Sequence, residues 1–232
     1  MTGFCVLGNR MRVLSVSDLG VGVSYAAALA LQERLHAGRV AGEVGDTLLL
    51  LEHRPVYTLG RSAAVEHVLY SEEALRQAGI ERVETSRGGD VTYHGPGQLV
   101  GYPIIHLGEA GLKVLEYLTG LEEALIKTAA TFGIAAGRDS RNRGVWAGND
   151  KLAALGIRVS RQVTMHGFAL NVTTALADYG GIGAGGLADA GVTSMARLLR
   201  RPPDMADVKQ CLIASFREVF GYGAVRLESN LL

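Results

Sequence analysis

Apolar and polar positions alternate along the 232-residue chain with two different periods. Apolar residues at helical spacing predict four helices, over 23–38, 71–79, 112–133 and 204–221. The first helix is expected to end at Gly38. Ser71 and Asp204 are the expected N-terminal caps of the second and fourth helices. Short runs of apolar or alternating residues predict strands over 47–52, 90–94, 98–107, 144–148, 151–160 and 163–174.

Two of these strand pairs are expected to form hairpins. Gly95-Pro96-Gly97 joins the strands 90–94 and 98–107, and Asn149-Asp150 joins the strands 144–148 and 151–160. Asn and Asp tolerate the positive φ of a tight hairpin turn. Because strands gather in the middle of the chain, with helices before, between and after them, the pattern predicts an α+β fold (mixed α/β) rather than a doubly wound one. We find no internal repeat or linker, so the whole chain, 1–232, is expected to form one domain.

Charge narrows the classes of partner. Lys plus Arg and Asp plus Glu both total 23, and this balance argues against a nucleic-acid-binding protein, which usually carries a basic excess. A local group of arginines still stands out, and it suits either a solvated loop or a landing site for an acidic protein. Its members are Arg138, Arg141 and Arg143, with Arg161, Arg200 and Arg201 further along the chain.

The sequence offers no targeting, disulfide or metal signature. Its cysteines, Cys5 and Cys211, give neither a disulfide framework nor zinc spacing, and the six histidines show no close metal spacing. No apolar run approaches the roughly 18 residues of a membrane span, and the N-terminal apolar stretch is too short for a signal peptide. We therefore expect a cytoplasmic protein with no metal and no membrane contact.

Nucleotide motifs are also missing. The chain has no G-x-x-x-x-G-K-[ST] phosphate loop and no G-x-S-x-G nucleophile elbow. The stretch "GIGAGG" at 181–186 matches G-x-G-x-x-G, but no strand leads directly into it and no acid follows about 20 residues later. We treat it as a chance match and expect no cofactor.

Glycine is abundant, and it concentrates around one candidate site. The chain has 31 glycines, about 13%, against an average usage of roughly 7%. Five of them fall in "RGGDVTYHGPGQLVGYP" at 87–103, where bare backbone would let a ligand approach closely. Strand alternation places Asp90, Thr92 and His94 on one face, and Val91 and Tyr93 on the other. The competing interpretation is a glycine-rich hairpin around a core histidine.

Lys151 is a second candidate. It opens an otherwise apolar strand directly after a tight turn, and an amine in such a setting can have a lowered pKa and act in acid–base chemistry. An exposed hairpin lysine is the simpler alternative. His166, beside Gly167, is interpreted as structural.

Taken together, these segments resemble the lipoyl(octanoyl) transferases. The family's order and spacing are matched from about Val16 to Phe220, which leaves 1–12 as an N-terminal extension. The matching segments are "LLEHRPVYTLGR", "RGGDVTYHGPGQLVGYP", "GVWAGNDKLAALGIRV", "MHGFALNV" and "GLADAGVTSM".

The resemblance implies the fold of the biotin/lipoate ligase catalytic domain, a mixed sheet flanked by helices. It also implies transfer of an octanoyl or lipoyl group from acyl carrier protein to a lysine of an acceptor protein. The acceptors would be the lipoyl domains of 2-oxoacid dehydrogenases and the H protein of glycine cleavage. Acyl carrier proteins are acidic, which would give the arginines at 138–143 a use.

Carried over by position, the resemblance makes Lys151 the acid–base residue and assigns the substrate pocket to three stretches. These stretches are Arg87, Gly88, Gly89, Asp90, Val91, Thr92, Tyr93 and His94; Ala154, Leu155 and Gly156; and Gly167, Phe168 and Ala169.

The chain departs from the family at the nucleophile. These transferases carry a Pro-Cys-Gly whose cysteine takes the acyl group as a thioester, and here Ala184 and Gly185 stand at the proline and the cysteine. Cys211 is expected to pack in the core, Cys5 lies in the extension, and Thr193 and Ser194 are expected to cap or turn the chain. None of these residues is a convincing replacement.

A transferase without the cysteine remains chemically feasible, because the donor thioester is already activated and the acceptor lysine can attack it directly. Its activity is expected to be weak. Two alternatives stay open: an ATP-dependent ligase of the same fold, which needs no cysteine, and a non-catalytic acyl-binding protein.

Overall fold

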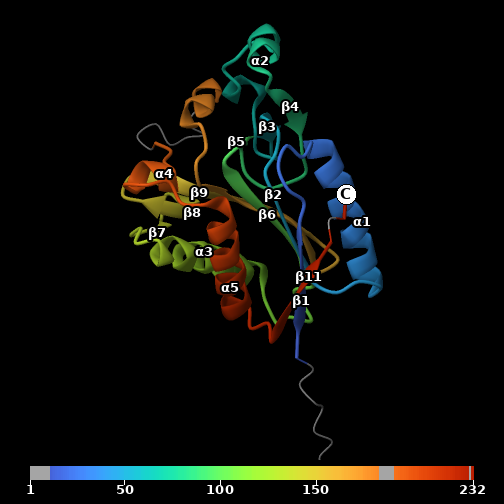
Figure 1. The fold of residues 1–232 in the computed structure, drawn as a ribbon. Helices are drawn as coiled ribbons and strands as arrows, with labels where there is room; N and C mark the ends of the chain where they lie inside the picture. The colour runs from blue at the N-terminus through green and yellow to red at the C-terminus, as the bar shows by residue number, and fades with distance from the viewer. Residues whose placement is uncertain (1–10, 183–190, 230) are drawn as a thin grey trace, which may run out of the picture.

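Two β-sheets and five α-helices make up the computed structural model, which describes residues 11–182, 191–229 and 231–232 (Figure 1). The strands are β1 Val13–Asp18, β2 Thr47–Leu51, β3 Val56–Leu59, β4 Glu81–Glu84, β5 Val91–His94, β6 Gln98–Ile104, β7 Gly137–Asp139, β8 Asn142–Ala147, β9 Asp150–Ser160, β10 Val163–Asn171 and β11 Ala224–Glu228. The α-helices are α1 Tyr25–Ala41, α2 Glu72–Ala78, α3 Val114–Thr131, α4 Met195–Leu198 and α5 Met205–Val219, and the 3₁₀ helices are η1 Val65–His67 and η2 Leu176–Gly181.

The large sheet is mixed. Its strand order is β11-β1-β2-β6-β10-β9-β8-β7; β1 runs parallel to both β11 and β2, and every other pair is antiparallel. A smaller sheet has the order β4-β3-β5. The predicted α+β (mixed α/β) class, a mixed sheet flanked by helices, is therefore confirmed.

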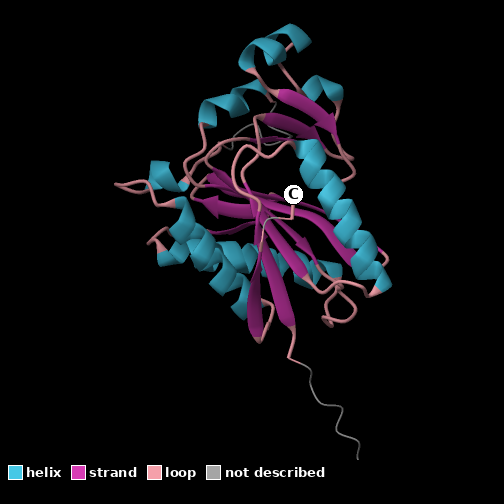
Figure 2. Ribbon diagram, turned by 45° about the vertical axis from the view of Figure 1, so that its right-hand side comes forward, coloured by secondary structure: helices cyan, strands magenta, loops and turns pink. Residues whose placement is uncertain are grey.

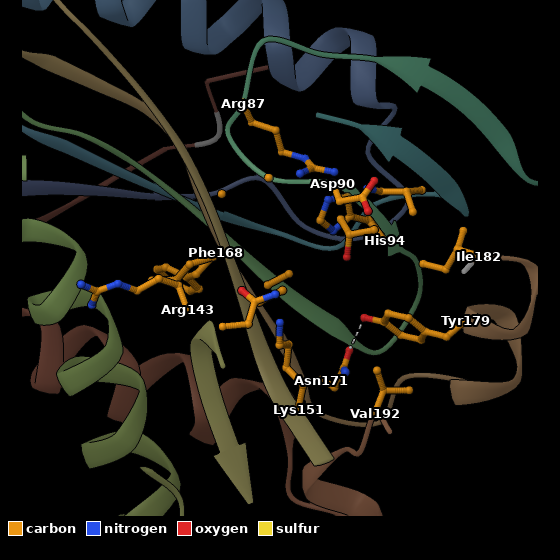
Figure 3. A pocket seen from close by; sticks show the side chains of 18 of the residues that line it. Arg87, Asp90, His94, Arg143, Lys151, Phe168, Asn171, Tyr179, Ile182 and Val192 are labelled. Carbon is orange, nitrogen blue, oxygen red and sulfur yellow. Dashed lines mark hydrogen bonds between the residues drawn. The ribbon is translucent and has the colours of Figure 1, made fainter. Parts of the chain in front are cut away.

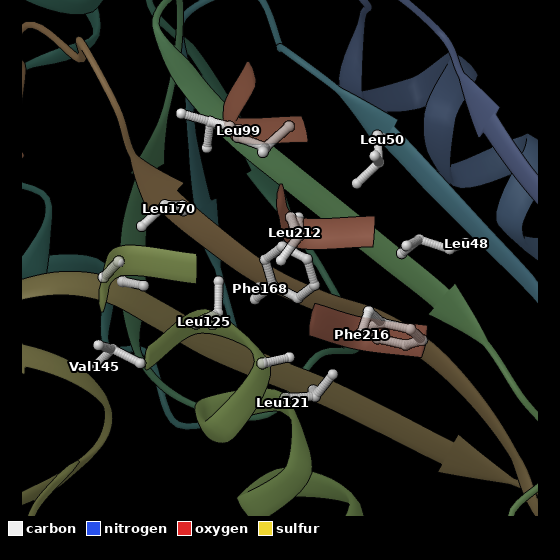
Figure 4. Close-up of a cluster of buried hydrophobic side chains, with 14 of the residues drawn as sticks. Leu48, Leu50, Leu99, Leu121, Leu125, Val145, Phe168, Leu170, Leu212 and Phe216 are labelled. Atoms are coloured by element: carbon white, nitrogen blue, oxygen red, sulfur yellow. The ribbon is translucent and has the colours of Figure 1, made fainter. Parts of the chain in front are cut away.

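The central strands β2, β6 and β10 of the large sheet are buried on both faces. Along β2, Leu48 and Leu50 join the cluster that includes Leu121 and Phe216 of α3 and α5, whereas Leu49 and Leu51 join the cluster beneath α1 (Figure 4). Successive strand residues point to opposite faces, so the run of leucines reflects helices on each side. In Figure 1, α1 lies on one side of the sheet and α3 and α5 on the other.

Local signals fix most helix ends. The Ser71 side chain accepts a hydrogen bond from the N–H of Ala74, and Asp204 accepts one from Ala206, so both predicted caps are confirmed. The first helix runs past Gly38 and ends at Gly42, which adopts φ 74°. The predicted end at Gly38 is wrong, because the left-handed conformation that terminates the helix falls on the later glycine.

One of the two predicted hairpins is correct. β8 and β9 pair across a tight turn, although the positive φ falls on Gly148, at 61°, rather than on Asn149 or Asp150. β5 and β6 do not pair with each other: β5 joins β3 in the small sheet, and β6 lies between β2 and β10 in the large one. The turn at 95–97 therefore carries the chain from the small sheet to the large one. Figure 2 shows the two sheets as separate groups of strands.

Candidate functional site

A cavity of about 440 Å³ lies between β9 and β10 of the large sheet and the segment 87–94 (Figure 3). This volume is within the range of small-ligand pockets, roughly 300–1,000 Å³. The three stretches assigned by resemblance meet here, although they are far apart in the sequence. Their lining members are Arg87, Gly89, Asp90, Val91, Thr92, His94, Ala154, Leu155, Gly156, Gly167, Phe168 and Ala169; Gly88 and Tyr93 are not among the lining residues.

The predicted alternation of side chains along β5 explains which residues of this segment line the cavity, with one exception. Asp90, Thr92 and His94 face the cavity, whereas Tyr93 is buried on the other side with Tyr57 and its hydroxyl donates to Asp178 at 2.6 Å. Val91 was expected on the Tyr93 side, but it contacts both that cluster and the cavity. It is the first residue of β5.

Arg87 holds the glycine-rich segment in place. Its side chain is 7% exposed, and its Nε donates to the Thr58 hydroxyl at 3.1 Å while Nη1 donates to the Gly88 carbonyl at 3.0 Å. Burial lowers the pKa of the guanidinium. A Cβ atom at Gly156 would lie 3.2 Å from Arg87 Cδ, so the bare backbone of β9 lets this side chain pass. Arg87 thus links the small sheet to the wall of the cavity.

Lys151 enters the cavity from the start of β9 (Figure 3). Its main chain is fixed on both sides, because its N–H donates to Gly191 and its carbonyl accepts from Thr193. The Nζ atom lies 4.8 Å from the centre of the Trp146 ring, and among the described residues it makes no hydrogen bond or salt bridge. Burial lowers the pKa of the amine, although the charge of Asp139 opposes this. The structure thus presents a desolvated amine to the cavity.

Three buried histidines lie at or beside this cavity. Burial lowers the pKa of His94 to about 3 and those of His53 and His166 to about 4. The ring of His94 stacks on Tyr25 at 6.5 Å, and His53 Nε2 lies 2.7 Å from the Tyr102 hydroxyl. All three imidazoles are therefore neutral at pH 7.

His166 takes a more specific position than sequence reasoning assigned to it. It lines the cavity with φ 57°, a left-handed conformation that non-glycine residues adopt rarely. Its N–H donates to Gln32 Oε1 at 2.8 Å, and its buried Nδ1 has no hydrogen-bond partner among the described residues. Strain and an unpaired polar atom together are typical of functional sites.

A polar network borders the cavity beside Lys151 and was not predicted. The Asn171 side chain donates to the Thr193 carbonyl at 3.0 Å, and its Oδ1 accepts from Gln98 and Tyr179 at 2.9 and 3.1 Å. The only sequence signal was the polar residue at the end of an apolar strand. Because these partners come from separate segments, their meeting depends on the tertiary fold.

Gly185, which the resemblance aligns with the transferases' cysteine, lies outside the described residues, as do Ala184 and Cys5. The described residues on each side of that segment, Ile182 and Gly191, both line the cavity. Cys211 does not line it, and it is half-buried rather than packed in the core. The helix α5 turns Leu212 and Phe216 inward instead.

The side chain of Ser194, which follows the segment that contains Gly185, has a structural role. Ser194 caps α4 by accepting a hydrogen bond from the Arg197 N–H, as predicted.

The arginines at 138–143 have internal partners. Arg138 and Arg143 both pair with the buried Glu122 at 3.1 Å, and Arg141 pairs with Asp139 at 2.8 Å. Nearby acids thus offset much of their charge.

The residues that the structure describes hold no cluster of His, Cys, Asp or Glu suited to a metal ion. Among them, no helix combines the length and the apolar character needed to cross a membrane.

The sequence and the fold of this chain are both similar to those of known proteins. The model of the lipoyl protein ligase A/B catalytic domain matches residues 24–217. An octanoyltransferase of Geobacter metallireducens is 49% identical over 203 residues, covering 88% of this chain and 92% of that protein. Protein Ta0514 of T. acidophilum with bound lipoic acid has a similar fold, with a TM-score of 0.75, 16% identity and coverage of 94% and 89%. A lipoate-protein ligase A bound with ATP gives a TM-score of 0.73 at 15% identity, with coverage of 94% and 88%.

Proposed function

The chain belongs to the lipoyl protein ligase A/B catalytic-domain family, and on that premise we propose that it transfers an octanoyl group from a carrier thioester to a lysine of an acceptor protein. The donor is octanoyl-acyl carrier protein. The acceptors are lipoyl domains of 2-oxoacid dehydrogenases and the glycine cleavage H protein, and the reaction takes place in the cytoplasm. It is the first step of lipoate assembly.

One observation carries this proposal: a single cavity brings Lys151 together with the glycine-rich segment 87–94 and the strand segments 154–156 and 167–169. Apolar groups such as Leu155 and Phe168 suit an alkyl chain. The polar groups around Lys151 suit the thioester end.

With Gly185 at the nucleophile position, the acceptor lysine attacks the thioester directly. An ordinary lysine, with a pKa of about 10.4, is free amine in only roughly 0.04% of molecules at pH 7. The desolvated amine of Lys151 supports a role as the base that receives the acceptor's proton, because its own pKa is lowered. The cavity contributes proximity. The mechanism then has one acyl transfer, without a covalent enzyme intermediate.

Two other functions use the same cavity. An ATP-dependent ligase would activate a free acid as an adenylate, and the similar fold of an ATP-bound ligase keeps it as the second candidate. A non-catalytic protein would bind the octanoyl group without transferring it. The absence of a phosphate-loop motif from the sequence favours the transferase over the ligase.

Intact-mass spectrometry of the acceptor tests the proposal. A lipoyl domain is incubated with octanoyl-acyl carrier protein and this protein, without ATP, beside a control that lacks this protein. The transferase predicts one octanoyl group on the acceptor above that control. Labelling of the acceptor that needs ATP and free octanoate would favour the ligase. Tight binding of the octanoyl group without labelling of the acceptor would favour the non-catalytic binding protein.

A further inference from the structure

Lys151 differs from every other lysine of the chain in its surroundings. It is the one primary amine that lines the cavity among the described residues. Lys127 and Lys209 pair with carboxylates on the surface, at 2.8 Å from Glu218 and 2.7 Å from Asp18. Lys113 is exposed at the N-terminus of α3. The cavity therefore has its own amine, and the rest of the chain offers three comparison lysines.

Packing holds the Lys151 stem against the cavity wall. The ring of Trp146 lies on one side, and a Cβ atom at Gly144 would be 3.4 Å from Lys151 Cε on another. No carboxylate within the described residues comes within salt-bridge distance of Nζ. An amine that is desolvated and lacks a counter-ion loses its proton more readily. It is then a nucleophile as well as a base.

The other nucleophiles that line the described part of the cavity are poor competitors. They include no cysteine and no serine. Burial raises the pKa of the Tyr25 and Tyr102 phenols, and it raises that of Tyr179 to about 12, so these hydroxyls stay protonated at pH 7. The Thr92 hydroxyl needs a base to be activated. His94 and His166 also line the cavity as neutral imidazoles, but their lowered pKa values make them weak nucleophiles, and an acyl-imidazole gives up its acyl group readily. Among the described residues, Lys151 is therefore the cavity nucleophile whose acyl product is stable.

We propose that Lys151 is itself an acyl acceptor, so that a chain holding an octanoyl thioester without an acceptor protein acylates its own Nζ. The inference rests on the proposed function, because the thioester must bind in the same cavity. Nζ attacks the thioester carbonyl carbon, and the C–N bond forms as the C–S bond breaks. Sulfur leaves with the electron pair and takes up the proton that nitrogen loses. The products are Nζ-octanoyl-Lys151 and the free carrier thiol.

This product is a dead end for transfer. An amide is too stable to pass its acyl group to another lysine, so the modified chain keeps it. Acylation also removes the base and leaves the octanoyl chain attached inside the cavity. Acceptor protein and Lys151 therefore compete for the same thioester, and the transferase limits itself when acceptor is scarce.

The test incubates the full chain with octanoyl-acyl carrier protein alone. Intact-mass spectrometry and peptide mapping should find one octanoyl group per chain, on Lys151 and stable to hydroxylamine, which cleaves thioesters. Lys151→Arg keeps the positive charge but has no primary amine, so the octanoyl adduct at this position should be lost. Lys127→Arg, at an exposed and paired lysine, should match the unaltered chain.

Other outcomes overturn the inference. An adduct of equal yield in Lys151→Arg, or one spread over Lys113, Lys127 and Lys209, would assign it to ordinary surface chemistry. No adduct on the chain, while an added acceptor is octanoylated, would refute self-acylation and leave the transferase intact. Neither adduct nor transfer would refute the proposed function and this inference together. Thermal melting of Lys151→Arg separates loss of the amine from loss of the fold.

Discussion

At the scale of single residues, the proposed transfer depends on the Lys151 amine. We expect Lys151→Ala to lower the initial rate of acceptor octanoylation by roughly 10²- to 10⁴-fold, the usual contribution of a general acid or base. The amine is desolvated and faces the cavity. Lys127→Ala, on the surface of α3, is the matched control. Equal rates in the two variants would contradict the assignment.

Sequence patterns identified several of the residues that line the cavity, and they missed others for a physical reason. Alternation alone placed Thr92 and His94 on the cavity side of β5. His166 and Asn171 were missed, because their significance depends on partners far away in the chain. The N–H of His166 meets Gln32, 134 residues away, and Asn171 meets Gln98, 73 residues away. No local pattern encodes such contacts.

At the scale of elements, β6 and β10 approach so closely that a side chain has no room between them. A Cβ atom at Gly167 would lie 2.2 Å from the Gly101 carbonyl oxygen and 2.6 Å from Pro103 Cδ. We expect Gly167→Ala to lower the free energy of unfolding by about 1–3 kcal/mol, since backbone must shift to admit the methyl group.

Urea unfolding measures this loss. Gly137→Ala is the matched control, because Gly137 also lies in a strand and nothing would lie within 4 Å of its Cβ. That control should stay within about 0.5 kcal/mol of the unaltered chain. Two variants of equal stability would show that the strands can separate locally at little cost.

Helices and strands were easier to predict from the sequence than the pairing of the strands. Caps and periodicity identify a helix from its own residues, as Ser71 and Asp204 demonstrate. Pairing is not local. The turn at Gly95–Gly97 looked like a hairpin, yet the Gly97 N–H donates to Glu52 and its carbonyl accepts from Val172 and Thr173. These contacts with distant strands separate β5 from β6.

At the scale of the whole molecule, the buried histidines make stability depend on pH. His53, His94 and His166 have pKa values lowered to about 4, 3 and 4, whereas an unfolded chain has the ordinary value near 6.5. Below pH 6.5 the unfolded state binds more protons, so stability is fully present above that pH and falls as pH drops toward 4. Each unit of difference contributes about 1.4 kcal/mol per histidine.

Urea unfolding at pH 7 and pH 5 should therefore give a smaller free energy of unfolding at pH 5. His36 lies outside this cluster, so His36→Gln should leave the difference unchanged. Equal or greater stability at pH 5 would mean that the three imidazoles titrate normally in the folded chain.

The central claim for the whole molecule is that this is an octanoyl transferase whose cavity is intact and whose rate is limited by Gly185. The most direct measurement compares ATP-independent octanoylation of a lipoyl domain by the unaltered chain and by Gly185→Cys. Removal of a nucleophile from a catalytic unit typically costs on the order of 10⁴ to 10⁶ in rate, so restoring the thiol should raise the rate by orders of magnitude. A folded Gly185→Cys protein that is no faster, or transfer that requires ATP in both proteins, would contradict the account.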